Sequence, residues 1–177
     1  MTIKLPQGIR LANIDDVPNI RKLVNAAYKE LADLGLNYTG TYQDEGITRD
    51  RMRSADVFVL ERNSEIIASI NLSVKDADTA NSCLYINQLA VNPNLKRQGI
   101  GKTLMALAEA RAMSLGFRYM RLDTAISATH LVAWYLRLGY RTVSEVQWDG
   151  KTYRSYIMEK DLELITRDFE NTLATDL

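Results

Sequence analysis

Apolar positions along the chain recur at helical spacing in four stretches and form short runs or alternations in seven others. The four stretches predict helices from Asp15, as a cap, to Gly35, from about residue 44 to residue 53, over residues 104–115 and over residues 127–138. The seven runs predict strands over residues 8–12, 56–61, 65–74, 84–91, 119–123, 140–148 and 152–159. Asp149-Gly150 separates the last two strands and is a strong hairpin signal.

The order of these elements is strand, two helices, three strands, helix, strand, helix, two strands. Such an order predicts an α/β (α+β) fold in which helices cover a mixed sheet in three layers. No repeat, low-complexity tract or Pro/Gly/Ser-rich linker divides the sequence. We therefore expect a single domain over residues 1–177, with a core at about 8–160 and an acidic, weakly helical tail at 161–177.

The composition and charge of the chain argue against several classes of function. The 177 residues carry 22 Lys+Arg and 22 Asp+Glu, so the chain lacks the positive charge that draws a domain to nucleic acid or to anionic membranes. One Cys and one His leave neither a cystine framework nor a zinc framework, and no metal is expected. The apolar runs fall short of the ~20 residues that span a bilayer, and the first residues lack a signal-peptide core, so a cytoplasmic location is the default expectation.

A glycine-containing loop lies between a buried-looking strand and a helix. It has the sequence Leu95-Lys96-Arg97-Gln98-Gly99-Ile100-Gly101-Lys102. Gly99 and Gly101 allow a tight turn in which backbone N–H groups converge on an anion at the helix N-terminus. The spacing fits neither a Walker A loop nor the dinucleotide fingerprint. A simple structural turn, or a site for another nucleotide, stays open on this motif alone.

The wider sequence around the loop resembles a known family. Three segments carry the resemblance: Tyr85-Ile86-Asn87-Gln88-Leu89-Ala90-Val91-Asn92-Pro93, the loop itself, and Ala133-Trp134-Tyr135-Leu136-Arg137-Leu138-Gly139-Tyr140. In chain order these segments contain Leu-Ala-Val, then Asn-Pro, then a [Gln/Arg]-x-x-Gly-x-Gly loop followed by a helix, and finally a Tyr shortly before a Gly-aromatic pair. This order resembles the GNAT superfamily of acyl-CoA-dependent N-acetyltransferases.

The resemblance implies a fold, an activity and a donor site. The fold would be a three-layer GNAT-like arrangement with a mixed, mostly antiparallel sheet of about seven strands and about four helices. The activity would be transfer of an acetyl group from acetyl-CoA to a primary amine of a small molecule or protein, by direct attack in a ternary complex. The residues implied to bind acetyl-CoA through their backbone are Leu89, Ala90 and Val91 for the pantetheine arm, and Lys96, Arg97, Gln98, Gly99, Ile100, Gly101, Lys102 and Thr103 for the pyrophosphate.

Tyr135 is the catalytic residue that the resemblance implies. It occupies the position that in many members supplies a proton to the leaving thiolate, a role that a phenol can fill. Its alternative interpretation is an aromatic core residue on an amphipathic helix.

The base that deprotonates the amine is not identified by the sequence. Asn87 and Gln88 stand where the family often has a carboxylate, and neither accepts a proton at neutral pH. Asp44, Glu45 and Asp123 are the candidate substitutes, although a carboxylate at a helix start or strand end is more often a surface residue than a catalyst. His130, the only His, is interpreted as an exposed or coenzyme-proximal side chain rather than a base. Cys83 is interpreted as a packing residue, because no nucleophile pattern surrounds it.

Two further positions depart from the family. Lys96 stands at the usual Gln/Arg position of the loop and keeps the charge without the planar fork. Ala128 stands where many members carry an Asn that contacts the coenzyme.

The acceptor site would involve residues 36–41, the second helix and the 149–150 hairpin. Tyr38, Tyr42 and Asp44 are the predicted acceptor-binding residues, although aromatic side chains in these segments could equally fill the core. A homodimer is expected only by analogy with the family. The competing class is a non-catalytic or regulatory acyl-CoA-binding module, which the missing carboxylate at Asn87 and Gln88 favours and Tyr135 disfavours.

Overall fold

The computed structural model describes residues 5–77, 79 and 81–163. A seven-stranded sheet has the order β1-β2-β3-β4-β5-β7-β6. Its strands are β1 (Ile9–Leu11), β2 (Asp56–Arg62), β3 (Glu65–Lys75), β4 (Cys83–Val91), β5 (Tyr119–Ala125), β6 (Arg141–Val146) and β7 (Ser155–Asp161). The α-helices are α1 (Val17–Asp33), α2 (Thr39–Tyr42), α3 (Glu45–Ser54), α4 (Ile100–Ser114) and α5 (Thr129–Arg137). Only the β4–β5 pair is parallel, so the predicted mixed, mostly antiparallel sheet of seven strands is confirmed.

Two local predictions need correction. The described chain has five α-helices rather than four, because residues 39–42 form the short helix α2 inside a segment that we expected to be a loop. Asp15 does not cap α1. Asn13 caps the 3₁₀ turn Ile14–Asp16 that precedes the helix: the Asn13 side chain accepts a hydrogen bond from the Asp15 amide, and the Asp16 carboxylate accepts one from the Asn13 amide. A short polar side chain placed one turn earlier satisfies the free amides of a 3₁₀ turn that precedes the helix.

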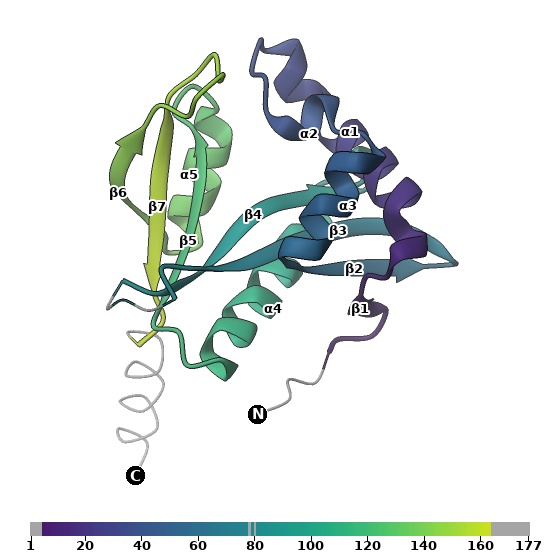
Figure 1. The fold of residues 1–177 in the computed structure, drawn as a ribbon, viewed down its shortest axis with the longest axis horizontal. Helices are drawn as coiled ribbons and strands as arrows, with labels where there is room; N and C mark the ends of the chain where they lie inside the picture. Colours follow the sequence, from purple (N-terminus) through teal and green to yellow (C-terminus); the bar gives the residue numbers. More distant parts are fainter. Residues whose placement is uncertain (1–4, 78, 80, 164–177) are drawn as a thin grey trace.

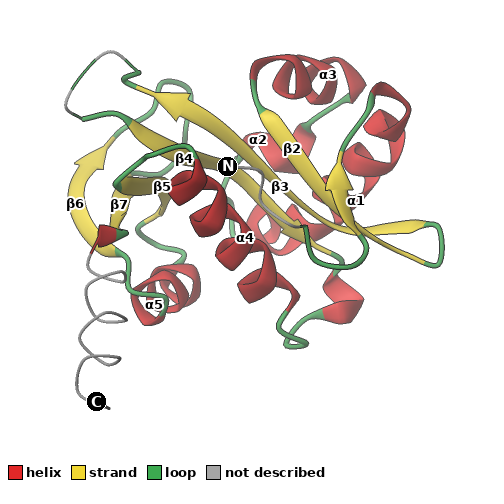
Figure 2. Ribbon diagram, turned by 90° about the horizontal axis from the view of Figure 1, so that it is seen from below, coloured by secondary structure: helices red, strands yellow, loops and turns green. Residues whose placement is uncertain are grey.

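Helices cover both faces of the sheet (Figure 1, Figure 2). On one face, Ile20, Leu23 and Val24 of α1 pack against apolar residues of β2 and β3 and against Ala90 of β4. On the other face, α4 and Tyr135 of α5 belong to the largest core cluster, together with residues of β3, β4, β5 and β7. No helix in the described part of the chain is long and apolar enough to cross a bilayer. The tail from 164 onward lies outside the described residues.

Strands β4 and β5 run side by side for only part of their length. Their pairing extends from Cys83 opposite Tyr119 to Ile86 opposite Leu122, and beyond that point the two strands fan apart (Figure 1). At the same place β4 contains a β-bulge, because Asn71 of β3 pairs with Gln88 and Leu72 pairs with Ile86, which leaves Asn87 as the extra residue. The sheet therefore opens from Asn87 onward, with backbone groups of β4 that no strand covers on the β5 side.

Candidate active site

The loop before α4 has the geometry of an anion site. Gly99 lies in the left-handed region with φ +79°, and Arg97 is also left-handed with φ +63°. No side chain caps α4, and the Thr103 amide is the first to bond inside the helix, to the Gly99 carbonyl at 3.0 Å. The amides before it therefore point outward at the positive end of the helix dipole, where a phosphate binds well.

The two glycines of the loop have different roles. Gly99 is the turn residue, and open space surrounds the position where its Cβ would lie. Gly101 lies within α4 without a positive φ, and a Cβ there would meet the Trp134 ring at 3.4 Å and Val91 at 4.0 Å. Gly101 is thus small because β4, α4 and α5 approach one another closely at this point.

Among the charged side chains of the loop, Lys96 is bound to another element. Its Nζ lies 2.6 Å from Oε2 of Glu30 on α1, whereas Arg97 and Lys102 are exposed. Lys96 therefore links the loop to the first helix across the open end of β4. His130 is exposed on the first turn of α5, and its charge also acts on Glu30.

The open half of β4 presents Leu89, Ala90 and Val91. Leu89 and Val91 pack on the α4 side, and Ala90 is buried under α1. Tyr28 of α1 reaches the same strand: burial raises the pKa of its phenol, and a hydrogen bond from the Leu89 backbone amide opposes that rise. The Tyr28 hydroxyl therefore lies close to the Leu89 backbone in the open half of β4.

Tyr135 lies in the wall of the same opening. It is 8% exposed, and its ring contacts Trp134 at a centroid distance of 4.9 Å. Burial raises the pKa of its phenol, with smaller contributions from Tyr28, Tyr38 and Asp123. Among the described residues no group hydrogen-bonds its hydroxyl, which leaves the proton available for transfer. A phenol is protonated at neutral pH, as a proton donor must be, and the burial that raises its pKa makes it a weaker acid.

A group of tyrosines holds the open end of β5 in place. The Tyr38 hydroxyl accepts the Ala125 amide hydrogen at 2.6 Å and lies 3.2 Å from the Thr124 hydroxyl. Its ring stacks on Tyr153 at 4.7 Å and meets Tyr28 edge-on at 5.7 Å. Tyr28 did not emerge from sequence reasoning, although its place on the apolar face of α1, four residues after Val24, was the available signal.

Asn87 and Gln88 occupy the position of the missing carboxylate and are both engaged with other amides. Asn87 Nδ2 donates to Asn71 at 2.8 Å and to Ser73 at 2.9 Å. Gln88 Nε2 donates to Gln43 at 3.0 Å, and Gln43 in turn donates to Thr48. Because these groups are neutral and satisfied, they act as structural ties across the open half of the sheet.

A cavity of about 460 Å³ lies on the face away from α4, where β4 and β5 begin to diverge. Its walls come from α3, β3, β4, β5, β7 and the hairpin before β7, and include Arg51, Lys75, Tyr85, Asn87, Asp123 and Trp148. The Asp123 carboxylate accepts the Tyr85 hydroxyl at 2.8 Å on one oxygen and the Trp148 indole N–H at 3.1 Å on the other. Asp123 is the first residue of β5 beyond its pairing with β4.

The predicted acceptor residues lie around this cavity without lining it. Tyr38 is engaged at the end of β5, as described above. Tyr42 is exposed, with its hydroxyl 3.2 Å from Lys151 Nζ. Asp44 caps α3 by accepting the Ile47 amide at 2.8 Å, and Glu45 follows it with a 3.9 Å contact to Arg49. Their contact with an acceptor stays a prediction.

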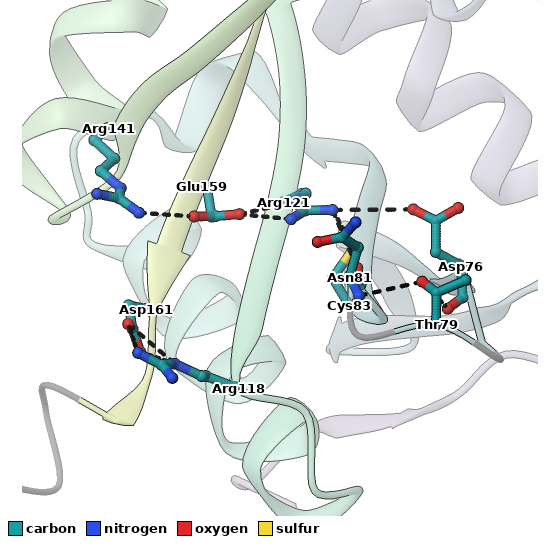
Figure 3. Close-up of polar contacts among 9 residues, drawn as sticks. All are labelled: Asp76, Thr79, Asn81, Cys83, Arg118, Arg121, Arg141, Glu159 and Asp161. Atoms are coloured by element: carbon teal, nitrogen blue, oxygen red, sulfur yellow. Dashed lines mark hydrogen bonds and ion pairs between the residues drawn. The ribbon is translucent and has the colours of Figure 1, made fainter.

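Arg121 belongs to an ion-pair chain that crosses three strands (Figure 3). It contacts Glu159 at 2.8 Å and Asp76 at 3.9 Å, and Glu159 also contacts Arg141 at 3.0 Å. Cys83 lies below the Arg121 side chain, and burial raises the pKa of its thiol. The charge of Arg121 is thus balanced within the wall. Among the described residues no group of three or more His, Cys, Asp or Glu side chains could hold a metal ion.

The comparisons agree with this geometry. The model of the acetyltransferase (GNAT) family matches residues 20–140, which include α1, the anion loop, both diverging strands and Tyr135. The chain belongs to the GNAT acetyltransferase family. Its enzyme class is therefore that of the acetyltransferases, and the seven-stranded sheet that opens between β4 and β5 is the family fold.

Individual relatives are more distant. The chain is 27% identical over 146 residues to an S-alkylcysteine N-acetyltransferase of Bacillus subtilis, which covers 80% of this chain and 82% of that protein. It is 27% identical over 157 residues to an S-(2-succino)cysteine N-acetyltransferase of the same organism, at 86% and 94% coverage. A PaiA N-acetyltransferase of Thermoplasma acidophilum in complex with coenzyme A has the same fold, with a TM-score of 0.69, 18% identity and coverage of 86% and 97%.

Proposed function

We propose that this chain transfers the acetyl group of acetyl-CoA to the primary amine of a small free amino acid, with S-substituted cysteines as the first candidates. The observation that carries the proposal is the opening between β4 and β5. The anion loop and Tyr135 approach the opening from the α4 side, and the 460 Å³ cavity approaches it from the opposite face. Donor and acceptor could therefore meet at the opening from opposite faces of one sheet.

On the donor side, the outward amides at the start of α4 would bind the pyrophosphate. The backbone of Leu89, Ala90 and Val91 would pair with the pantetheine arm as an added strand does. The Leu89 amide would then exchange its contact with the Tyr28 hydroxyl for one with the bound donor. Such an exchange retains the hydrogen bond, so a buried amide is not left without a partner.

The chemical step needs one proton for the leaving sulfur. The bound ammonium first loses one proton to solvent. The neutral amine then attacks the thioester carbon, the C–N bond forms, the C–S bond breaks, and the thiolate takes the Tyr135 proton. The proton that the amine nitrogen loses restores the phenol through solvent. A phenol is protonated at neutral pH whether or not burial raises its pKa, so Tyr135 carries its proton when the thiolate forms beside it.

On the acceptor side, the relatives support a small amino acid. Both Bacillus subtilis proteins are N-acetyltransferases of S-substituted cysteines, and each covers at least four-fifths of this chain. The cavity wall combines charged groups with Tyr85, Trp148 and Ile157, which suits a charged backbone joined to an apolar side chain.

The test has two stages. Calorimetric titration with acetyl-CoA, with ATP and NAD as controls, should show selective binding. Thiol release should then be measured with S-alkylcysteines, S-(2-succino)cysteine and a peptide bearing a free N-terminus, and should favour the free amino acids. Binding without release on any amine would favour the non-catalytic module, and a preference for the peptide would contradict the small-molecule acceptor.

A further inference from the structure

Charged side chains line the acceptor cavity, and the structure shows which of them have a partner of opposite charge. Arg121 and Asp76 contact each other, and Arg121 is bound more closely to Glu159 (Figure 3). Asp123 accepts hydrogen bonds from Tyr85 and Trp148, which are both neutral. In the described part of the chain neither Arg51 nor Lys75 makes an ion pair. The wall thus carries one anion and two cations that are not balanced by an opposite charge.

Asp123 is placed to bind a cation at the opening. Each of its two oxygens accepts one hydrogen bond, and a carboxylate has about four acceptor positions, so an ammonium can join without displacing either donor. Two neutral donors fix the carboxylate, as a preorganised binding site requires. The negative charge of Asp123 also acts on Tyr135, on the opposite face of the sheet, because it contributes to raising the pKa of that phenol.

Arg51 is the cation suited to a carboxylate. It lies in α3 and its side chain is half-buried. Its backbone carbonyl accepts the Asn71 amide at 3.5 Å and the Ser54 hydroxyl at 3.3 Å, and its guanidinium has no hydrogen-bond partner among the described residues. A guanidinium presents a planar pair of N–H donors that match the two oxygens of a carboxylate. Lys75 is exposed, with its Nζ 6.0 Å from the Tyr85 ring centroid, and offers only a point charge.

From this arrangement we propose that the cavity binds a zwitterionic α-amino acid by both of its charges, with Asp123 holding the ammonium and Arg51 holding the carboxylate. The proposal rests on the proposed function and adds the two residues that determine acceptor specificity. Asp123 and Arg51 lie on different walls, β5 and α3, so the acceptor would bridge the two halves of the molecule. Trp148 and Ile157 would then face its side chain.

The experiment compares two substrates that differ only in the carboxylate, S-benzyl-L-cysteine and S-benzylcysteamine. In Arg51→Gln, kcat/KM for the amino acid should fall at least ~10-fold, while that for the amine should stay within about twofold, because a charged hydrogen bond is lost for one substrate only. Arg53→Gln is the matched control, since Arg53 lies on the same helix and pairs with Asp50 at the surface. It should change neither value.

Asp123→Asn should lower kcat/KM for both substrates at least ~10-fold, because both carry the ammonium. Thermal unfolding checks that each variant folds. Equal losses on both substrates in Arg51→Gln, no loss, or a loss that appears in Lys75→Gln instead, would overturn the assignment of Arg51. Unchanged kinetics in Asp123→Asn would overturn that of Asp123.

Failure of this inference can be separated from failure of the proposed function. Wild-type protein is titrated calorimetrically with acetyl-CoA alone, and with S-benzyl-L-cysteine in the presence of coenzyme A. Acetyl-CoA binding without amino-acid binding overturns the acceptor assignment only. Absence of acetyl-CoA binding overturns the proposed function. Amino-acid binding that Arg51→Gln weakens at least ~10-fold supports the cavity assignment in either case.

Discussion

The two halves of the β4–β5 pair are held together in different ways. In the closed half, up to Ile86 and Leu122, backbone hydrogen bonds join the strands, and the ion pairs of Arg121 and Glu159 cross one face. In the open half, side chains take over: Tyr38 binds the Ala125 amide, and the amides of Asn87 and Gln88 tie β4 to its other neighbours. The same two strands thus provide stability at one end and an accessible site at the other.

If this division is correct, a substitution in the closed half should cause the largest loss of stability. Glu159→Gln leaves Arg121, whose side chain is 19% exposed, without its nearest charge partner and should lower the free energy of unfolding by about 2–4 kcal/mol. Urea unfolding measures this. The control is Glu145→Gln on the neighbouring strand, whose more exposed pair with Arg154 should contribute under about 1 kcal/mol. Equal losses would mean that the ion-pair chain does not support the closed half.

The largest loss of activity should come from the open half. Tyr135→Phe removes one hydroxyl that makes no hydrogen bond within the described residues, so turnover should fall at least ~10-fold with little change in stability or in acetyl-CoA affinity. Tyr140→Phe removes a neighbouring buried hydroxyl, which contacts only the Met120 sulfur at 3.9 Å, and should keep its turnover. Unchanged thiol release in Tyr135→Phe would remove this residue from the mechanism.

The two ends of α4 offer a matched pair of glycines. Gly99, at the open end, and Gly116, at the closed end, have φ of +79° and +81°, and both positions are surrounded by open space. Alanine at either should cost about 1 kcal/mol from left-handed strain. Only Gly99→Ala should also weaken acetyl-CoA binding, by roughly 3–10-fold, because the backbone amide of residue 99 lies in the anion loop. Calorimetric titration measures the acetyl-CoA affinity of both variants. Equal affinities would contradict the assignment of the loop as the anion site.

The smallest effect should come from Tyr38→Phe. It leaves the Ala125 amide without its acceptor and should cost about 0.5–1.5 kcal/mol of stability together with part of the turnover, since the open end of β5 is no longer fixed. Tyr42→Phe removes an exposed hydroxyl near Lys151 and should change stability by under about 0.5 kcal/mol. Full activity in Tyr38→Phe would show that pairing with β7 and packing hold the end of β5 without this hydroxyl.

Sequence reasoning succeeded where one local signal determines the structure. Alternation in residues 65–74 predicted β3, and Gly139 and Gly150 both adopt the left-handed conformations that turns require. These features depend on neighbours in the chain, which is why the pattern was sufficient. The roles of the glycine loop and of Tyr135 were implied by the family resemblance of three segments, and they stay predictions.

The acceptor cavity could not be predicted in this way. Arg51, Asp123 and Trp148 are far apart in sequence, and each is unremarkable in its own segment. Asp123 was considered as a base on its residue type alone, and only its contacts with Tyr85 and Trp148 distinguish it from Asp44, which caps a helix. Tertiary contacts between distant segments decide these roles.

The extra residue at Asn87 has a consequence for reading mutational data along β4. Leu84 and Ile86 face the main core before the bulge, whereas Leu89 and Val91 do so after it, so the inward positions change from even to odd numbers. Burial keeps one phase, because Gln88 and Ala90 are buried on the other face, so a saturation scan across residues 83–91 should show low tolerance at Leu84, Ile86, Gln88 and Ala90 alike. Deleting Asn87 would remove the bulge and keep Leu89 and Val91 on the α4 side, because Ile86 and Gln88 already pair with the adjacent residues Leu72 and Asn71.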